Sequence, residues 1–558
     1  MILKLLAEQF SGSIQETGSF RGDDYVIVIK ESLLDICFFL RNEDLLKFEM
    51  LLDVAGADYL ERFGFLEVVY HLYSLKFKKR LRLKVQLKAN ETIPSVCNIW
   101  KAANWFEREA YDLFGIKFAD HPNLKRILTF EGFQGHALLK SYKKEMRQEI
   151  PVPDDLLDSR LRGNDNMNGN DKRYMYLNLG PSHPAMHGCF RVLLELDGEK
   201  IVNAVQEIGY LHRCFEKEAE AHTYTQVIPY TDRLNYVSPL MNNVGYCLSV
   251  EKLFDLDIPE RAKWIRMLIC EVSRIIDHLV SVGPNLVDVG ALTNYWYLFN
   301  AREMLIDWVE ALCGARLTTS YTRIGGVMRD LPINTSAKLT ECIKLVRQAV
   351  KDVEGLTKKN RILIDRTQGV GSISAEDAIS YGFTGPCLRA AGVAYDVRLA
   401  HPYYFYDELN WDIPVGHQGD TYDRIFVRLE EIKQSSYLVE QILQKIKPGP
   451  IILDDWQISL PDKAQVYGSI EGMMAHFKLI MEGIKPPVGE VYAYTEAANG
   501  ELGFYLVSDG SVNPYRLKIR PPCFAIYQAY PEMIKGQMIA DAVATIGSLN
   551  IIAGELDR

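Results

Sequence analysis

The sequence predicts an α+β fold: a small N-terminal α+β domain, then a large, mainly helical domain flanked by β regions. Polar and apolar residues alternate at 80–88, as in a half-buried strand, while apolar residues recur at helical spacing in 95–114. Helical periods dominate between residues 261 and 446, with strand-like runs before and after them. The 558 residues allow roughly two to four domains, and an apolar content of 48% excludes a wholly disordered chain.

A change of composition divides the chain. Residues 154–173 read DDLLDSRLRGNDNMNGNDKR, which is rich in Asn, Asp and Gly and offers few apolar side chains for a core. Such a composition is typical of a flexible linker. We therefore expect a first domain at 1–153, a linker at 154–173 and a second domain at 174–558.

In the first domain, the alternating segment 80–88 reads RLRLKVQLK and predicts a strand with a basic outer face. A solvated basic ridge is the interpretation that we favour, and an edge on which a partner docks is the alternative. The segment 95–114 carries Trp100, Trp105, Phe106 and other apolar residues at helical spacing, which predicts a helix. Strand and helix together indicate an α+β domain.

The second domain is expected to begin and end with strands. Strand-like runs occupy 174–179 and 189–196, and the Asp197-Gly198 turn leads into a further strand from Ile201. Its helices are predicted at 261–282, 292–312, 336–356 and 422–446. Strands are predicted again within 488–519, where Asn499-Gly500 and Asp509-Gly510 mark the turns.

Charge and hydropathy exclude several classes of protein. A formal net charge of −10 argues against nucleic-acid binding, which requires a basic surface. No apolar run approaches the ~20 residues of a membrane-spanning helix. The opening segment MILKLLAEQF lacks the cleavage site of a signal peptide. We therefore expect a soluble, cytoplasmic protein without a nucleic-acid partner.

The cysteines and glycines exclude further sites. The ten cysteines are scattered without a CxxC pair, whereas zinc sites and iron–sulfur clusters usually draw on clustered thiolates. We therefore expect the chain to hold no metal and no cluster of its own. Neither GxGxxG nor GxxxxGK[ST] is present, so neither a dinucleotide-binding fold nor a P-loop is supported.

Two histidines four residues apart stand in the segment 178–188, NLGPSHPAMHG. On a helix, His183 and His187 would share one face as in zinc proteases, but the glutamate of HExxH is absent. Pro181 and Pro184 also disfavour a regular helix, so we expect a proline-braced loop. Structural histidines bonded to backbone carbonyls and histidines of a functional loop both remain possible on these residues alone.

Two further segments combine polar residues with apolar surroundings. Tyr236 lies in YTDRLNYVS (230–238), either as a core aromatic with a satisfied hydroxyl or as part of a site. Asp288 lies in VDVGALT (287–293), where it could cap the following helix or orient a histidine from another segment. Spacing alone does not link these segments to His187.

Many segments match the motifs of one protein family, and they follow one another along the chain in the same order as in that family. Throughout 173–558 the chain resembles the D subunit of respiratory complex I, the proton-pumping NADH–quinone oxidoreductase. The matching segments are GPSHPAMHG (180–188), HRxxEK (212–217), DRLNYVS (232–238), DVGALT (288–293), RIGGV (323–327), GPCLRAAGVAYDVR (385–398), GDTYDR (419–424), GELGFYLVSDGS (500–511) and PYRLKIRPP (514–522). ANWFEREAYDLFG (103–115) and HPNLKRIL (121–128) resemble the C subunit, so the chain looks like a fused C/D subunit.

This resemblance implies a quinone-reducing site. His187 and Tyr236 match the residues thought to bond the quinone headgroup, and Asp288 matches the carboxylate that partners the histidine. His183 belongs to the same loop. Arg213 and Arg233 match basic residues beside the last [4Fe–4S] cluster, which a neighbouring subunit holds. Departures from the family stand at GHALLKS (135–141), in place of GHPLRKD, and at Thr318, where many relatives have a histidine.

The resemblance also implies a fold, partners and a location. The D subunit is similar to the large subunit of nickel–iron hydrogenases, whose two CxxC pairs this sequence lacks. The implied partners are the cluster-bearing B subunit, the I and G subunits, the membrane H subunit and quinone. The implied location is peripheral, on the cytoplasmic side of the bacterial inner membrane. A subunit of a related membrane-bound hydrogenase, or of a ferredoxin- or coenzyme-linked dehydrogenase, is the alternative.

Overall fold

The computed structural model describes residues 2–146, 148 and 174–558. The predicted linker at 154–173 lies outside the described residues, and the domain boundaries at 153 and 174 therefore stay predictions. Within the described part, no helix is both long and apolar enough to cross a membrane.

The N-terminal part is built on a five-stranded sheet with the order β1-β2-β5-β4-β3. The β2–β5 pair is parallel and the other pairs are antiparallel. The strands are β1 (Ile14–Phe20), β2 (Asp23–Val28), β3 (Met50–Tyr59), β4 (Phe65–Ser74) and β5 (Lys79–Lys88). The helix predicted at 95–114 begins at Ala103 as α4 (Ala103–Phe114) and stops at Gly115, whose left-handed φ of 76° breaks the helical path.

The prediction of a solvated basic ridge on the strand at 80–88 is wrong. Arg82 and Lys84 of β5 are only 2% and 5% exposed. They face acidic partners: Arg82 forms ion pairs with Asp23 and Glu490, and Lys84 with Glu67 and Glu490. The basic face is therefore an internal junction with the C-terminal part of the same chain.

The second part opens with an antiparallel sheet of the order β10-β9-β8. The strands β8 (Met175–Leu179), β9 (Arg191–Asp197) and β10 (Lys200–Glu207) confirm the three predicted strands within two residues. Between β8 and β9 the chain forms only a short 3-10 turn, η2 (Pro184–Met186), as its prolines require.

Long helices form the centre of the second part. The predicted helices correspond to α9 (Glu260–Asp288), α10 (Leu292–Cys313), α11 (Thr335–Thr357) and α16 (Thr421–Lys445). A further helix, α8 (Pro239–Phe254), precedes them. The helix α9 runs six residues beyond its predicted end, through Pro284, because it is buried along most of its length among α8, α10, α16 and α21 (Ile539–Leu549). Tertiary packing here outweighs the local cost of a proline.

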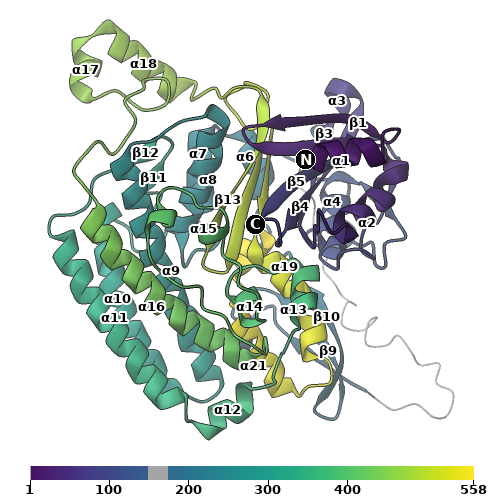
Figure 1. The fold of residues 1–558 in the computed structure, drawn as a ribbon, viewed down its shortest axis with the longest axis vertical. Coiled ribbons are helices and arrows are strands. Elements are labelled where there is room, and N and C mark those ends of the chain that lie inside the picture. Colours follow the sequence, from purple (N-terminus) through teal and green to yellow (C-terminus); the bar gives the residue numbers. More distant parts are fainter. Residues whose placement is uncertain (1, 147, 149–173) are drawn as a thin grey trace.

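A second antiparallel sheet joins the helices to the N-terminal part (Figure 1). It consists of β13 (Gly489–Ala497), β14 (Gly500–Ser508) and β15 (Arg516–Arg520), as the Asn-Gly and Asp-Gly turns predicted. Every residue of β14 is buried, and one hydrophobic cluster contains Tyr492, Tyr505 and Val507 together with Ala55 and Val69 of the N-terminal sheet. The two parts of the chain therefore share a core.

The remaining elements are short. The helices are α1 (Ile2–Gln9), α2 (Leu33–Asn42), α3 (Leu60–Phe63), α6 (Phe215–Ala221), α7 (Tyr224–Thr231), α12 (Arg361–Thr367), α13 (Ala375–Ser380), α14 (Gly385–Ala390), α15 (Val397–Ala400), α17 (Lys463–Gly468), α18 (Ile470–Met481), α19 (Pro522–Gln528), α20 (Tyr530–Ile534) and α22 (Ala553–Asp557). The strands are β6 (Thr92–Pro94), β7 (Lys117–Ala119), β11 (Thr322–Arg323) and β12 (Gly326–Val327), and the other 3-10 turns are η1 (Lys30–Ser32) and η3 (Tyr406–Glu408).

Candidate functional site

The histidine loop between β8 and β9 uses its two imidazoles differently. His183 caps the turn η2, because its Nδ1 accepts a hydrogen bond from the Ala185 N–H at 3.2 Å. His187 closes the turn in a left-handed conformation with φ of 55°. The loop is not a helix, and among the described residues the pair belongs to no group of three metal-binding side chains. The zinc-protease arrangement is therefore absent from the described chain.

Asp288 is the last residue of α9 and lies beside His187. Its Oδ2 is 2.6 Å from His187 Nε2, and the two side chains are 20% and 27% exposed. Of the two alternatives for Asp288, the structure shows the histidine contact, since no side chain caps α10 at Ala291. Gly547 of α21 permits this approach, because a Cβ there would lie 3.3 Å from Asp288 Oδ2.

Tyr236 lies in the turn between α7 and α8 and is 39% exposed, so it is not a core aromatic. Partial burial raises the pKa of its phenol, the neighbouring Cys189 and Asp277 raise it further, and Arg213 opposes them. Because Cys189 is two residues from His187, the histidine loop and the Tyr236 turn are neighbours. Among the described residues, none forms a hydrogen bond with the Tyr236 hydroxyl, which leaves it available to a ligand.

The two predicted arginines lie together. Arg213 donates from one guanidinium nitrogen to the backbone carbonyls of Arg233, at 3.0 Å, and Gly554, at 2.9 Å. The Arg233 side chain is 47% exposed and donates to the Pro229 carbonyl at 2.7 Å. Thr318 is exposed on the loop after α10, and buried Asp232 holds that loop by accepting from the backbone and hydroxyl of Ser320.

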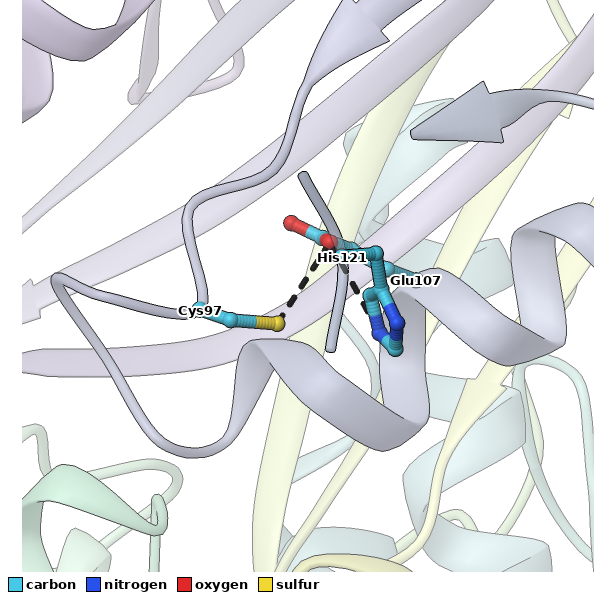
Figure 2. A group of neighbouring side chains, drawn as sticks. All are labelled: Cys97, Glu107 and His121. Carbon is cyan, nitrogen blue, oxygen red and sulfur yellow. Dashed lines mark hydrogen bonds and ion pairs between the residues drawn. The ribbon is translucent and has the colours of Figure 1, made fainter. Parts of the chain in front are cut away.

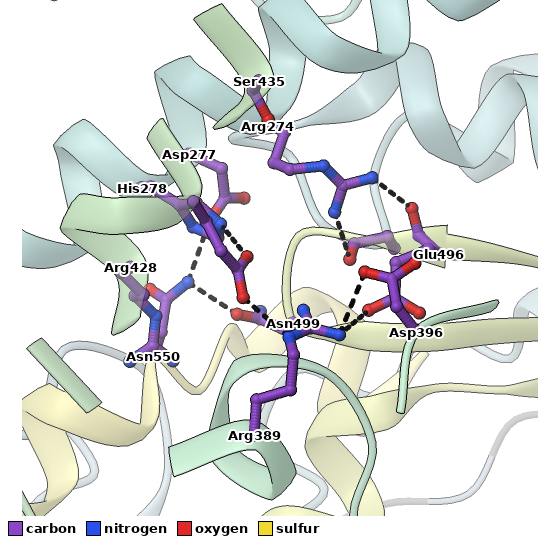
Figure 3. A network of polar contacts seen from close by, with 12 residues as sticks. Arg274, Asp277, His278, Arg389, Asp396, Arg428, Ser435, Glu496, Asn499 and Asn550 are labelled. Atoms are coloured by element: carbon purple, nitrogen blue, oxygen red, sulfur yellow. Dashed lines mark hydrogen bonds and ion pairs between the residues drawn. The ribbon is translucent and has the colours of Figure 1, made fainter. Parts of the chain in front are cut away.

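A buried polar network beneath the Tyr236 turn was missed by the sequence analysis. Asp277 of α9 accepts hydrogen bonds from the side-chain amides of Asn235 and Asn550, both at 2.9 Å. Asn550 also donates to Asn499, and the two side chains are drawn in Figure 3. The donor and acceptor atoms are 2.7 Å apart. The one signal in the sequence is that Asp277 precedes Asp288 by three helical turns on the same helix.

The next residue of α9 enters an ionic network. His278 Nε2 lies 2.8 Å from Glu431, which also accepts from Arg389 at 2.8 Å. Arg389 in turn contacts Asp396 and Glu496. Burial alone would raise the pKa of Glu431, but Arg389 and His278 outweigh it and lower the pKa. These groups fix α9 against α14, α16 and β13.

Comparison with known proteins decides the family. Residues 288–558 match the family model described as "Respiratory-chain NADH dehydrogenase, 49 Kd subunit", and residues 26–148 match "Respiratory-chain NADH dehydrogenase, 30 Kd subunit". The C/D subunit of the NADH-quinone oxidoreductase of Bdellovibrio bacteriovorus is 51% identical over 549 residues, which cover 96% of this chain and 95% of that protein.

The chain belongs to the family of fused C/D subunits of NADH-quinone oxidoreductase, or complex I. The D 2 subunit of the NADH-quinone oxidoreductase of Anaeromyxobacter sp. is 52% identical over 69% of this chain and 90% of that protein. The D subunit of the Myxococcus xanthus enzyme is 51% identical over 69% of this chain and 92% of that protein. These relatives do not favour the alternative of a hydrogenase or a ferredoxin-linked enzyme.

One group of possible metal ligands lies in the C-like part of this fused chain. Cys97, Glu107 and His121 place their ligand atoms within 4.8 Å of one another (Figure 2). However, His121 Nδ1 accepts from the Asn123 N–H at 3.0 Å, and Nε2 lies 3.0 Å from the Asn104 carbonyl, to which it donates. Glu107 accepts from Ser95 and Val96. The imidazole lone pair that a metal requires is already used.

All ten cysteines of this fused chain lie within the described residues, and none forms a disulfide. Burial raises the pKa of several of these thiols, among them Cys97 and Cys247, so they are protonated at neutral pH. Burial would also raise the pKa of Cys214, but a hydrogen bond and charge from His212 outweigh it and lower that pKa.

Proposed function

We propose that His187 and Tyr236 bind and protonate a quinone headgroup, and that Asp288 orients His187, within the NADH-quinone oxidoreductase to which this fused chain belongs. The observation that supports this most is the 2.6 Å contact between His187 and Asp288 beside a tyrosine whose hydroxyl is unused among the described residues. The first residue of the pair comes from a loop and the second from the end of α9, so the fold itself brings them together.

The residue types suit the chemistry. Reduction of a quinone to a quinol adds two electrons and two protons, one proton to each carbonyl oxygen. Asp288 holds the His187 imidazole in one orientation, from which it can give a proton to one oxygen. The Tyr236 hydroxyl stays protonated at neutral pH and can donate to the other oxygen. Donors already placed at the developing charge are worth roughly 3–4 kcal/mol each in a site shielded from water.

In this proposal the electrons come from a [4Fe–4S] cluster held by a neighbouring subunit, which the scattered positions of the ten cysteines support. Arg213 and Arg233 present positive charge beside Tyr236, which would favour the more negative, reduced state of a nearby cluster. We assign His183 to the quinone loop through its cap on η2, which shapes the turn that ends at His187.

We extend the proposal to the setting of the site. The helical core is proposed to share the fold of the nickel–iron hydrogenase large subunit without its metal site, which the scattered cysteines support. The proposed partners are the cluster-bearing B subunit, the I and G subunits and the membrane H subunit. The proposed location is peripheral, on the cytoplasmic side of the bacterial inner membrane.

The test replaces the two proposed donors in the assembled complex. His187→Ala and Tyr236→Phe should each leave the complex assembled but lower the turnover rate with a short-chain quinone by about 10²–10³-fold. Electron transfer from NADH to an artificial acceptor, which does not need the quinone site, is the control and should be unchanged. Full quinone reduction by both variants would reject the proposed site.

A further inference from the structure

The helix α9 carries a second carboxylate on the face that bears Asp288. Asp277 precedes Asp288 by eleven residues, which is within about 20° of three full turns of an α-helix. The two differ in surroundings: Asp277 is 1% exposed, whereas the Asp288 side chain is 20% exposed at the helix end. The same face of one helix therefore presents an aspartate to each of the two segments that carry the proposed donors.

Asp277 reaches Tyr236 through Asn235. The Asn235 amide donates to Asp277 Oδ2 at 2.9 Å, and Asn235 Oδ1 accepts the Val237 N–H at 3.1 Å. The Asn235 side chain therefore connects the residues before and after Tyr236, and it fixes their turn to α9. The Asn235 carbonyl also accepts from Asn242 of α8 at 3.0 Å, so the turn is held on both sides.

The other oxygen of Asp277 ties the turn to the C-terminal segment. Asn550, which follows α21 in a left-handed conformation with φ of 57°, donates to Asp277 Oδ1 at 2.9 Å. Among the described residues, no lysine or arginine forms an ion pair with Asp277. Its oxygens serve as acceptors for two amides, and a buried carboxylate held in this way costs free energy unless both bonds are made.

We propose that Asp277 is a positioning residue for Tyr236, as Asp288 is for His187, so that α9 sets the separation of both proton donors. This inference rests on the proposed function, because it assigns Asp277 a role at the same site. Asp277 does not touch the quinone. It acts by holding the 235–237 turn where the Tyr236 hydroxyl faces the headgroup.

The key variant exchanges the carboxylate and the amide. In Asp277→Asn alone, the new side chain offers one acceptor to two amide donors, so one of the two hydrogen bonds is lost. Adding Asn235→Asp restores all of them: residue 235 accepts from the Val237 N–H and from the amide at 277, and residue 277 accepts from Asn550. The exchange therefore keeps the geometry while it moves the charge.

We expect Asp277→Asn to lower kcat for quinone reduction by roughly tenfold or more, with a smaller change in KM, because a misplaced donor affects the chemical step. The Asp277→Asn/Asn235→Asp exchange should recover most of that loss. Asp257→Asn, at an exposed position before α9, is the matched control and should behave as the wild type. Should Asp277→Asn fail to assemble, the exchange variant alone decides: an assembled complex with a low rate overturns the inference.

A cryo-EM map of each assembled variant separates this inference from the proposed function. If Tyr236→Phe retains full activity while Asp277→Asn displaces residues 235–237, the proposed function fails, and only the structural part of the inference stands, namely that Asp277 positions this turn. If Tyr236→Phe loses activity while Asp277→Asn keeps both the wild-type rate and the wild-type turn, the inference fails and the proposed function stands. Combining Asp277→Asn with Tyr236→Phe should add nothing to the loss caused by Tyr236→Phe.

Discussion

The junction between the N-terminal and C-terminal sheets and the candidate quinone site differ in how fully their polar side chains are paired. At the junction, Arg80 donates to both oxygens of the fully buried Glu501 at 2.8 Å. Lys518 likewise sits among Glu109, Asp53 and Glu216. At the site, Tyr236 is 39% exposed and its hydroxyl bonds to none of the described residues.

The difference lies in unused hydrogen-bonding capacity. A buried charge whose partners surround it fixes one arrangement of the chain, and nothing remains for a ligand to bind. A half-exposed donor that is oriented but not satisfied can bind a ligand without first breaking an internal bond. Residue type therefore says little about function until the partners of each side chain are known.

The largest effect should come from breaking one junction pair. Arg80→Met leaves Glu501 buried without its main partner, which should lower the free energy of unfolding by about 3–5 kcal/mol. Arg316→Met is the control: Arg316 has three acidic partners but is 44% exposed, so solvent screens its ion pairs and the loss should be far smaller. Urea unfolding of the full chain measures both, and equal losses would contradict the contrast.

Acid should weaken the junction in a defined pH range. Burial alone would raise the pKa of Glu501, but the charge and hydrogen bonds of Arg80 lower it from 4.5 to about 2. Because the pKa is lower in the folded state, this stabilisation is complete above the unfolded pKa and is lost as pH falls from 4.5 toward 2. The loss is on the order of 3 kcal/mol.

The matched variant for that range is Glu501→Gln, which removes the titrating group. Its urea midpoint should lie below that of the wild type at pH 7, and it should fall less steeply between pH 4.5 and 2. Parallel curves for the two proteins would show that Glu501 does not contribute to the acid sensitivity.

A smaller effect is expected from the orienting carboxylate of the site. Asp288→Asn should lower quinone reduction by about tenfold, because His187 loses the carboxylate that orients its imidazole. The double variant with His187→Ala should be no slower than His187→Ala alone, since Asp288 acts through the imidazole. Steady-state rates of the assembled complex test this, and losses that multiply would exclude the coupling.

The smallest effect concerns Cys97, Glu107 and His121. Since both imidazole nitrogens of His121 are already hydrogen-bonded, zinc or a chelator should change the melting temperature of the full chain by less than about 1 °C. A larger zinc-dependent shift that disappears in Cys97→Ser would show that these three residues bind zinc.

Much of the fold could be predicted because its signals are local. The four long helices repeat their apolar spacing over six or more turns, and the strands of β13–β15 are marked by Asn-Gly and Asp-Gly turns. The burial of Arg82 could not be predicted, because alternation in β5 does not say which face meets water. Its partner Glu490 lies about 400 residues away in the sequence.

The candidate site could be predicted only in part. Spacing alone left His187, Tyr236 and Asp288 in three unlinked segments, and the family resemblance joined them. The structure adds the His187–Asp288 contact across 101 residues. Asp277 was missed because it lies within an apolar helix, and its partners Asn235 and Asn550 are 42 and 273 residues distant.

Because the two parts share a core, their covalent fusion affects how fast they dock. The D subunit of the Myxococcus xanthus enzyme matches 69% of this chain, and the match covers 92% of that subunit, so there the matching part is a polypeptide of its own. When both halves are translated as one product, they arise in equal copy number. Their docking is then a first-order step, whose rate constant does not depend on the protein concentration.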